Sequence, residues 1–226
     1  MTAPLTPQRA RAIQRRWPVV SGITAVVLVV GLGAIVALRS GPYEFDAEWL
    51  EELVEVRAPF WSVLAMLMNF IGGGWFSIVV PIGVGVVLLI ARKPWSALYF
   101  VLTSAVSGLL VQLLKNLFDR ARPELQLVTA DFGSFPSGHV ANAATVSVGL
   151  AIMLTRVWVW LAAAAYTALM ALSRTYLGVH WLSDTVGGAL LGGAVAILVW
   201  APFAERLRRE WRPGAPDPGP PPVSAD

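Results

Sequence analysis

Long apolar runs separated by short polar breaks fill most of the chain. A helix needs about 20 mostly apolar residues to cross a bilayer. Runs near this length cover residues 19–38, 95–114, 139–154, 157–172 and 184–203, and a longer run at 59–91 is broken by three glycines at 72–74. We expect residues 59–71 to be a partly inserted first piece and 75–90 to complete that crossing. The pattern predicts an all-α fold, a polytopic membrane bundle of six transmembrane helices.

The segment at 44–57 follows a different pattern. It carries six acidic residues interleaved with apolar ones, among them Trp49, Leu50, Leu53 and Val56. Alternation of this kind is typical of an amphipathic helix lying on a membrane surface. A lid over the path by which a lipid reaches the protein is the alternative for this helix.

Two further patterns concern the helices themselves. The run at 19–38 is longer than the apolar core of a signal peptide and lacks a clear small-x-small cleavage site, so we expect an uncleaved first helix. In the last run, Gly188 and Gly192 are four residues apart. This spacing is typical of a small-residue face that packs closely against another helix of the bundle.

Composition supports the membrane assignment. Hydrophobic residues make up 56% of the 226 residues, and the mean hydropathy is +0.65. Charged residues make up 14%, too few to solvate a globular surface of this size. Without cysteine, the chain has no disulfide framework and no thiolate nucleophile or ligand. The pI of about 9.7 does not indicate nucleic-acid binding, because the basic residues lie at the helix ends rather than in one patch.

The positions of the cations predict the orientation in the membrane. Six spans put both termini on one side, which carries the larger set of cations: Arg9, Arg11, Arg15, Arg16, Arg92, Lys93, Arg156, Arg206, Arg208, Arg209 and Arg212. The opposite side carries Arg39, Arg57, Lys115, Arg120, Arg122 and Arg174. Because cytoplasmic loops are enriched in Lys and Arg, both termini are expected in the cytoplasm. The predicted organisation is a basic tail at 1–18, a six-helix domain at 19–203, and a basic then proline-rich tail at 204–226 that we expect to be disordered.

Polar motifs gather on the side that is expected to be poor in cations. The first, KNLFDRARP, begins at Lys115 and contains Arg122, seven residues and two helical turns further on. We expect Asp119, Arg120 and Glu124 in and after this motif to be solvated. Ordinary cations at a membrane edge are the plainer interpretation of the pair, but it fits poorly on this side.

The second motif is Pro136-Ser137-Gly138-His139, a turn that runs into a predicted helix. Ser137 is a good N-cap, and Gly138 lets the backbone approach a ligand closely. Free N–H groups at a helix start favour anion binding. The tetrapeptide alone is weak evidence, since Pro-Ser-Gly is a common turn.

The third motif, SRTYLGVHWLSD, contains Arg174, His180 and Asp184. Asp184 lies one helical turn after His180, within reach of its Nδ1–H, which would leave Nε2 available for attack. An isolated His-x3-Asp pair is also typical of a buried structural histidine. Arg174 and the two upstream motifs favour a site for phosphate-ester chemistry.

Together the three motifs match the signature Lys-x6-Arg-Pro, Pro-Ser-Gly-His and Ser-Arg-x5-His-x3-Asp. The chain therefore resembles the type 2 phosphatidic-acid phosphatases, membrane lipid phosphatases that share their site with vanadium-dependent haloperoxidases. The resemblance covers the motifs between residues 115 and 193 and, through the six-helix plan, the whole chain.

The resemblance implies a role for each signature residue. His180 would attack phosphorus and form a phosphohistidine, with Asp184 orienting it. His139 would protonate the leaving oxygen and then activate water. The phosphoryl oxygens would be held by the remaining residues: Lys115, Arg122, Ser137, Gly138 and Arg174.

The expected function is a metal-independent lipid phosphatase without a cofactor, since three cations can take the place of a metal and the sequence has no cluster of metal ligands. Candidate substrates are undecaprenyl diphosphate, phosphatidic acid, phosphatidylglycerophosphate and diacylglycerol diphosphate. The site would face the outer side of a bacterial inner membrane, at the membrane–water interface. A lipid phosphotransferase, a vanadate-dependent haloperoxidase and a non-enzymatic lipid-phosphate transporter are the alternatives. The sequence makes no prediction of oligomeric state.

Overall fold

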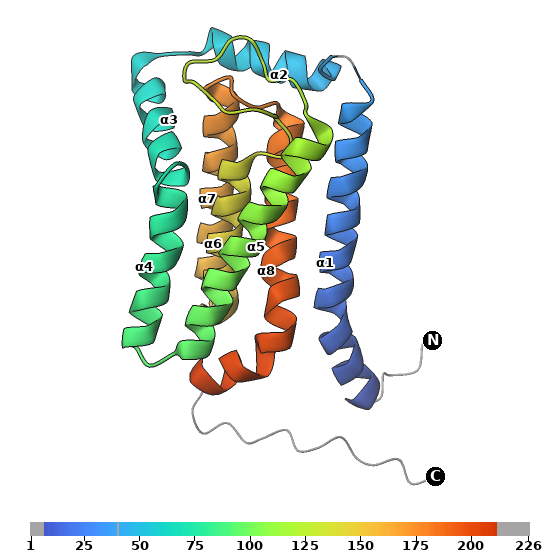
Figure 1. Cartoon of the computed structure of the whole chain (residues 1–226), viewed down its shortest axis with the longest axis vertical. Coiled ribbons are helices and arrows are strands. Elements are labelled where there is room, and N and C mark those ends of the chain that lie inside the picture. Colours follow the sequence, from blue (N-terminus) through green and yellow to red (C-terminus); the bar gives the residue numbers. More distant parts are fainter. Residues whose placement is uncertain (1–6, 40, 212–226) are drawn as a thin grey trace.

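The protein is a bundle of helices, described by a computed structural model that covers residues 7–39 and 41–211, with side chains from residue 16 onward. The helices are α1 (Pro7–Ala37), α2 (Glu44–Glu55), α3 (Pro59–Gly72), α4 (Phe76–Ile90), α5 (Pro94–Phe118), α6 (Gly138–Leu154), α7 (Val157–Tyr176) and α8 (Leu182–Trp211) (Figure 1). Across the described residues every regular element is a helix, which confirms the all-α prediction.

The number of membrane crossings is confirmed only in part. By length and hydropathy, four helices qualify as spans: α1, α5, α7 and α8. The pair α3 and α4 qualifies jointly as a fifth, bent by 58° at the glycine break. Helix α6 is apolar but only 17 residues long. A six-span arrangement therefore stays a prediction.

Several helices extend beyond their predicted apolar runs. Helix α1 begins at Pro7 rather than at residue 19, and α8 continues to Trp211 rather than ending at 203. The apolar run marks the part of a helix suited to lipid, whereas the helical backbone can continue into polar surroundings. The expectation of disorder is wrong for residues 204–211 of the C-terminal tail, which are helical, and the rest of that tail, from 212 on, lies outside the described part.

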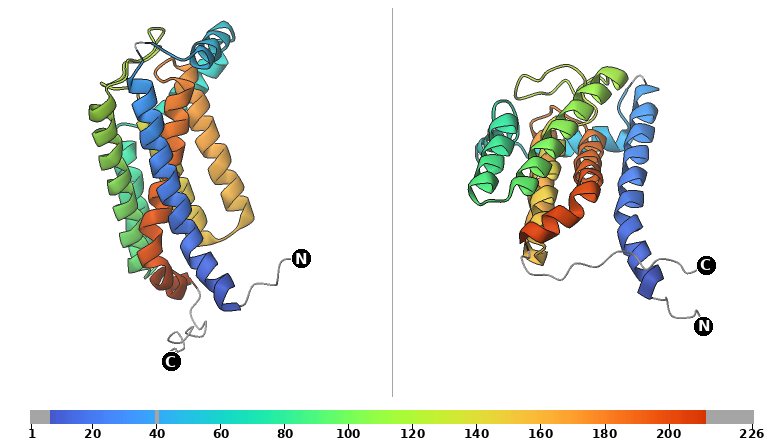
Figure 2. Two further views of the ribbon diagram at one scale, coloured as in Figure 1. Left: turned by 90° about the vertical axis from the view of Figure 1, so that its right-hand side faces the viewer. Right: turned by 60° about the horizontal axis from the view of Figure 1, so that its bottom comes forward.

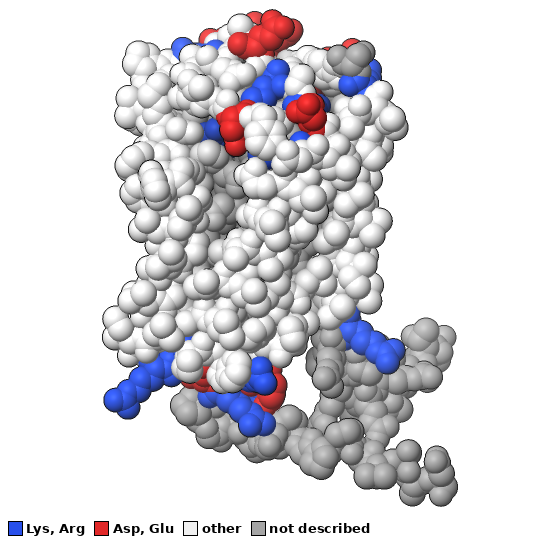
Figure 3. All heavy atoms as spheres, in the orientation of Figure 1, with Lys and Arg blue, Asp and Glu red and all other residues white. Residues whose placement is uncertain are grey.

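The outer surface of the bundle is apolar between two charged ends. Large apolar side chains are exposed along α1, α3, α4, α5 and α7. On the face seen in Figure 3 this belt carries no charged side chain, and acidic and basic side chains gather at its two ends. The start of α1 and the end of α8 lie at one end, and α2 crosses the bundle at the other (Figure 1). This distribution suits a chain embedded in a bilayer.

Helix α6 lies inside the bundle, packed against α5, α7 and α8 (Figure 2). Its contact with α8 depends on small residues. A Cβ added to Gly188 would lie 2.5 Å from the carbonyl oxygen of Ser137, and one added to Gly192 would lie 2.2 Å from that of Ala141. The two glycines therefore let the helix backbones approach closely, which confirms the predicted packing face.

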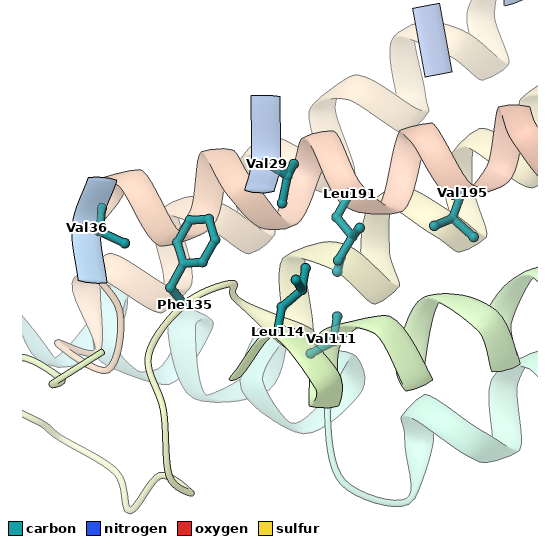
Figure 4. Packing of buried hydrophobic residues seen from close by; sticks show 8 residues of the cluster. Val29, Val36, Val111, Leu114, Phe135, Leu191 and Val195 are labelled. Carbon is teal, nitrogen blue, oxygen red and sulfur yellow. The ribbon is translucent and has the colours of Figure 1, made fainter. Parts of the chain in front are cut away.

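One core cluster anchors the polar end of the bundle. Its buried residues include Val29 and Val36 of α1, Val111 and Leu114 of α5, Phe135 of the loop after α5, and Leu191 and Val195 of α8 (Figure 4). Phe135 is fully buried and stacks edge-on against Phe118. Because Phe135 lies two residues before Ser137, this packing fixes the loop that leads into α6.

The neighbouring glycines of α8 provide a matched test of the α6–α8 contact. Gly192→Ala places a methyl group against the Ala141 carbonyl, so we expect a loss of stability of about 1–3 kcal/mol from overpacking. Gly193→Ala meets no atom within 4 Å and should be neutral or stabilising by up to about 1 kcal/mol, because alanine favours helix. Thermal unfolding in detergent measures both. Equal melting temperatures for the two variants would contradict the close packing.

Candidate active site

Lys115 lies in the last turn of α5 with 3% of its surface exposed. Its Nζ donates hydrogen bonds to the carbonyl oxygens of Gly133 (2.7 Å) and Phe132 (3.3 Å) and contacts the carboxylate of Asp131 at 3.3 Å. The loop that leads toward α6 therefore folds back over the end of α5. Gly133 adopts a φ of +59°, and a side chain there would meet Lys115 at 3.1–3.2 Å.

Arg122 lies in the same loop and joins it to the loop before α8. Its Nε donates to the backbone oxygen of Asp131 at 2.8 Å, and its Nη1 donates to the carbonyl of Val179 at 2.6 Å. Nη2 pairs with the Asp131 carboxylate at 2.6 Å. Nη1 also lies 3.3 Å from Nε2 of His180. The guanidinium thus lies beside the Nε2 edge of that imidazole.

Ser137, Gly138 and His139 form the start of α6. Ser137 is the N-cap, and its backbone N–H donates to the carbonyl oxygen of Asp184 at 3.0 Å. Its Oγ is buried and has no hydrogen-bond partner among the described residues. His139 is packed against the glycine break between α3 and α4, and a Cβ on Gly73 would lie 2.1 Å from its Nε2.

Arg174 extends from the last turn of α7 toward the same place. Its Nη1 donates to Oδ1 of Asn69, while its Nε is buried with no partner in the described part of the protein. Asn69 also holds His139, because its carbonyl oxygen lies 3.2 Å from His139 Nε2. Asn69 therefore links a cation and an imidazole that are distant in sequence.

His180 lies between α7 and α8 and is 3% exposed. Its Nδ1 lies 3.5 Å from Oδ2 of Asp184 and 3.4 Å from Oγ of Ser134. Burial lowers the pKa of His180 to about 4, although the hydrogen bond and charge of Asp184 raise it. His180 is therefore neutral at pH 7. With Nδ1 directed to Asp184, Nε2 carries the lone pair and faces Arg122.

Asp184 accepts more hydrogen bonds than its motif suggests. Its Oδ2 accepts from Ser134 Oγ (2.5 Å) and from the backbone N–H of Trp181 (2.8 Å), and its Oδ1 accepts from Arg120 Nη1 (2.5 Å). The expectation that Arg120 is solvated is wrong. It is 8% exposed and pairs with two buried carboxylates, whereas Asp119 and Glu124 are exposed as expected.

A cavity of about 680 Å³ is lined by most of these side chains together with residues of α4 and α5. At its polar end lie Lys115, Arg122, His139, Arg174 and His180. Its other walls come from α4 and α5 and include Ile78, Pro81, Ile82, Val101 and Leu109. The structure thus brings all three motifs to one cavity with a cationic end and an apolar end.

Comparison with known families decides what kind of protein has this cavity. A family model described as "PAP2 superfamily" matches residues 96–208. This stretch makes up half of the chain and contains all three motifs. The chain belongs to the PAP2 superfamily.

Relatives of this PAP2 protein are lipid phosphatases. It is 31% identical to phosphatidylglycerophosphatase B of Bacillus subtilis over 69% of this chain and 81% of the relative. It is 37% identical to an undecaprenyl-diphosphatase of Sulfolobus acidocaldarius over 29% of this chain and 31% of that protein. The fold matches the crystal structure of the transmembrane PAP2-type phosphatidylglycerolphosphate phosphatase from Bacillus subtilis with a TM-score of 0.74 and 27% identity, covering 84% of this chain and 98% of the other.

The described residues of this PAP2 protein contain no group of three His, Asp or Glu side chains placed to hold a metal ion. The polar end of the cavity is instead built from cations and imidazoles. Such groups suit the binding of an anionic phosphoryl group.

Sequence reasoning missed four residues of this PAP2 site. Arg120 and Ser134 hold Asp184, Asn69 holds Arg174, and Asp131 holds both Lys115 and Arg122. The sequence did contain a signal that Arg120 has a special role, because it is a cation on the side where the positive-inside rule predicts few cations. Asn69 and Ser134 carry no such signal.

Asp131 generates a testable prediction. Its half-exposed carboxylate contacts the two cations expected to hold phosphate, so it competes with an incoming phosphoryl group for the same donors. Asp131→Asn should therefore lower the inhibition constant of inorganic phosphate or vanadate by roughly fivefold, corresponding to about 1 kcal/mol for a partly exposed ion pair. Competition assays with a soluble phosphate ester measure it. Weaker inhibition of the variant would show instead that Asp131 serves to align the cations.

Proposed function

We propose that this protein is an integral membrane lipid phosphatase that hydrolyses phosphate monoesters or diphosphates of lipids through a phosphohistidine on His180. The observation that carries the proposal is the setting of that imidazole. Nε2 lies 3.3 Å from the Arg122 guanidinium, and Nδ1 faces the carboxylate of Asp184. A neutral imidazole held in one tautomer beside a phosphate-binding cation is arranged for attack on phosphorus.

The first step forms a bond between His180 Nε2 and phosphorus and breaks the bond from phosphorus to the leaving oxygen, which belongs to the lipid in a monoester and to the lipid monophosphate in a diphosphate. His139, in the same cavity, gives a proton to that leaving oxygen. Positive charge develops on His180 during attack, and the buried carboxylate of Asp184 stabilises it. In the second step water attacks phosphorus, His139 takes the proton of the water, and phosphate leaves as His180 is regenerated.

The phosphoryl oxygens are proposed to lie among the cations and two unpartnered polar groups. Lys115, Arg122 and Arg174 offset the charge that grows in the transition state. Ser137 Oγ and Arg174 Nε are buried without hydrogen-bond partners among the described residues, and phosphoryl oxygens would satisfy both. The Gly138 N–H at the start of α6 supplies a further donor. With these donors in place we propose that catalysis needs no metal and no cofactor.

The shape of the cavity supports a lipid substrate. The phosphate end lies against the cations. The walls from α4 and α5 mix polar residues such as Ser104 and Gln112 with apolar ones such as Ile78, Ile82 and Val101, and the apolar ones suit a hydrocarbon chain. Polyprenyl diphosphate and phosphatidylglycerophosphate are the first substrates to consider, since the names of the relatives include both kinds of activity. We place the site on the outer face of a bacterial plasma membrane with both termini in the cytoplasm, on the basis of the cation distribution.

A panel of lipid phosphates tests the function directly. Purified protein in detergent should release inorganic phosphate from at least one of undecaprenyl diphosphate, phosphatidylglycerophosphate, phosphatidic acid and diacylglycerol diphosphate. His180→Ala should lower that release by roughly a thousandfold or more, because it removes the nucleophile. Colorimetric phosphate detection and chromatography of the lipid products provide the measurement.

The same assay separates the alternatives. Phosphate appearing on an added alcohol or sugar instead of in solution would identify a phosphotransferase. Unchanged turnover or transport of lipid phosphate by His180→Ala would contradict the covalent mechanism and favour a transporter. Complete inhibition by EDTA that only added Mg²⁺ reverses would contradict metal independence.

A further inference from the structure

Asp46 differs from every other acidic residue of α2. The remaining acids of this helix, Glu44, Glu48, Glu51, Glu52 and Glu55, are exposed. Asp46 is 0% exposed, and its carboxylate contacts Ser183 of α8 and Arg120 of the loop after α5. A fully buried carboxylate is costly unless it is paired and hydrogen-bonded. Its contacts therefore reveal what the helix does.

The carboxylate of Asp46 contacts Ser183, which precedes Asp184 in the chain, and Arg120, which pairs with Asp184. Its Oδ1 accepts the backbone N–H of Ser183 at 2.9 Å, and its Oδ2 accepts the Ser183 hydroxyl at 2.7 Å and Arg120 Nη2 at 2.8 Å. The other terminal nitrogen of Arg120, Nη1, donates to both Ser183 Oγ and Asp184 Oδ1. Arg120 is thus held between two buried carboxylates, one from α2 and one from α8.

The position of Ser183 adds a second link. It is the second residue of α8, where backbone N–H groups have no partner within the helix and where the helix dipole favours a negative charge. Asp46 supplies that charge and that acceptor from another helix. The first turn of α8, which carries Asp184, is therefore fixed by α2 on one side while Asp184 contacts His180 on the other.

The charges explain why two carboxylates are needed. Arg120 is buried, so its positive charge acts strongly on any neighbour. With Asp46 present, the guanidinium is shared between two carboxylates. Without Asp46, Arg120 would pair with Asp184 alone and offset the negative charge that Asp184 offers to His180.

We propose that Asp46 is a positioning residue of the phosphatase reaction. It holds Arg120 and the start of α8, so that the carboxylate of Asp184 stays aligned with His180 and its negative charge remains available to stabilise the His180 cation. This inference rests on the proposed function, in which His180 is the nucleophile. Through Asp46 alone, α2 then supports the first turn of α8, and the alternative of a lid over the lipid path does not account for the buried contacts of Asp46.

Asp46→Asn is the informative change, because the amide oxygen can still accept from the Ser183 N–H while the charge is lost. We expect kcat to fall by roughly tenfold, the lower end of what partners of an orienting carboxylate–histidine pair contribute in metal sites. KM and the inhibition constant of inorganic phosphate should change by less than about twofold, since Asp46 contacts none of the phosphate-binding cations. Glu48→Gln, an exposed acid of the same helix, is the matched control and should behave as wild type.

The pH profile of kcat/KM distinguishes the two roles, because a purely structural role of Asp46 would leave the position of its acid limb unchanged. The charged or titratable groups acting directly on His180 are Asp184, Arg122, Arg174 and His139, while Arg120 acts on Asp184. Loss of the Asp46 charge leaves the cation Arg120 less compensated, which lowers the pKa of His180. The acid limb of kcat/KM should therefore move to lower pH in Asp46→Asn and stay in place in Glu48→Gln.

A double-variant cycle keeps the test decisive if Asp46→Asn is unstable. The negative charge of Asp46 offsets the positive charge of Arg120. The fold-loss of kcat in the double variant Asp46→Asn with Arg120→Gln should therefore be smaller than the product of the two single fold-losses. Multiplicative losses of kcat, inhibition by inorganic phosphate that weakens in proportion to kcat, or an unmoved acid limb would each overturn the positioning role. Failure of the proposed function shows separately, as lipid phosphate turnover that persists in His180→Ala.

Discussion

Charge buried at the end of an apolar bundle is costly unless every charged group finds a partner, and the arrangement of this protein follows from that constraint. Lys115 and Arg122 are held by the carbonyl oxygens of residues 131–133 and by the Asp131 carboxylate. Asp184 is held by Arg120 and Ser134. The long loop between α5 and α6 supplies most of these partners, so its conformation is as important to the site as the helices are.

The apolar core fixes that loop. Phe135 packs with side chains of α1, α5 and α8, and the absence of a Cβ at Gly187 makes room for its ring. Two residues later Ser137 caps α6 and binds the backbone of Asp184. Core packing and site geometry are therefore coupled through a few residues, and the close α6–α8 contact keeps the second and third motifs together.

Most of the helices could be predicted, and the eight candidate site residues could be proposed, because each depends on local pattern. Apolar runs mark the spans, and the motif spacing places His180 and Asp184 one turn apart. The length of the polar helix ends could not be read from hydropathy, as the early start of α1 shows. The burial of Arg120 could not be predicted either, because it depends on Asp46, 74 residues away, and the acidic pattern of α2 does not distinguish the one acid that faces inward.

The central claim is that His180 carries the phosphoryl group, and trapping the intermediate tests it most directly. Enzyme mixed with a lipid substrate radiolabelled in its phosphate and quenched with alkaline detergent within milliseconds should retain label on protein. Peptide mapping should place that label on His180, as an alkali-stable and acid-labile phosphate, and His180→Ala should retain none. Full turnover by wild-type enzyme with no trapped label, or label on a different residue, would contradict the account.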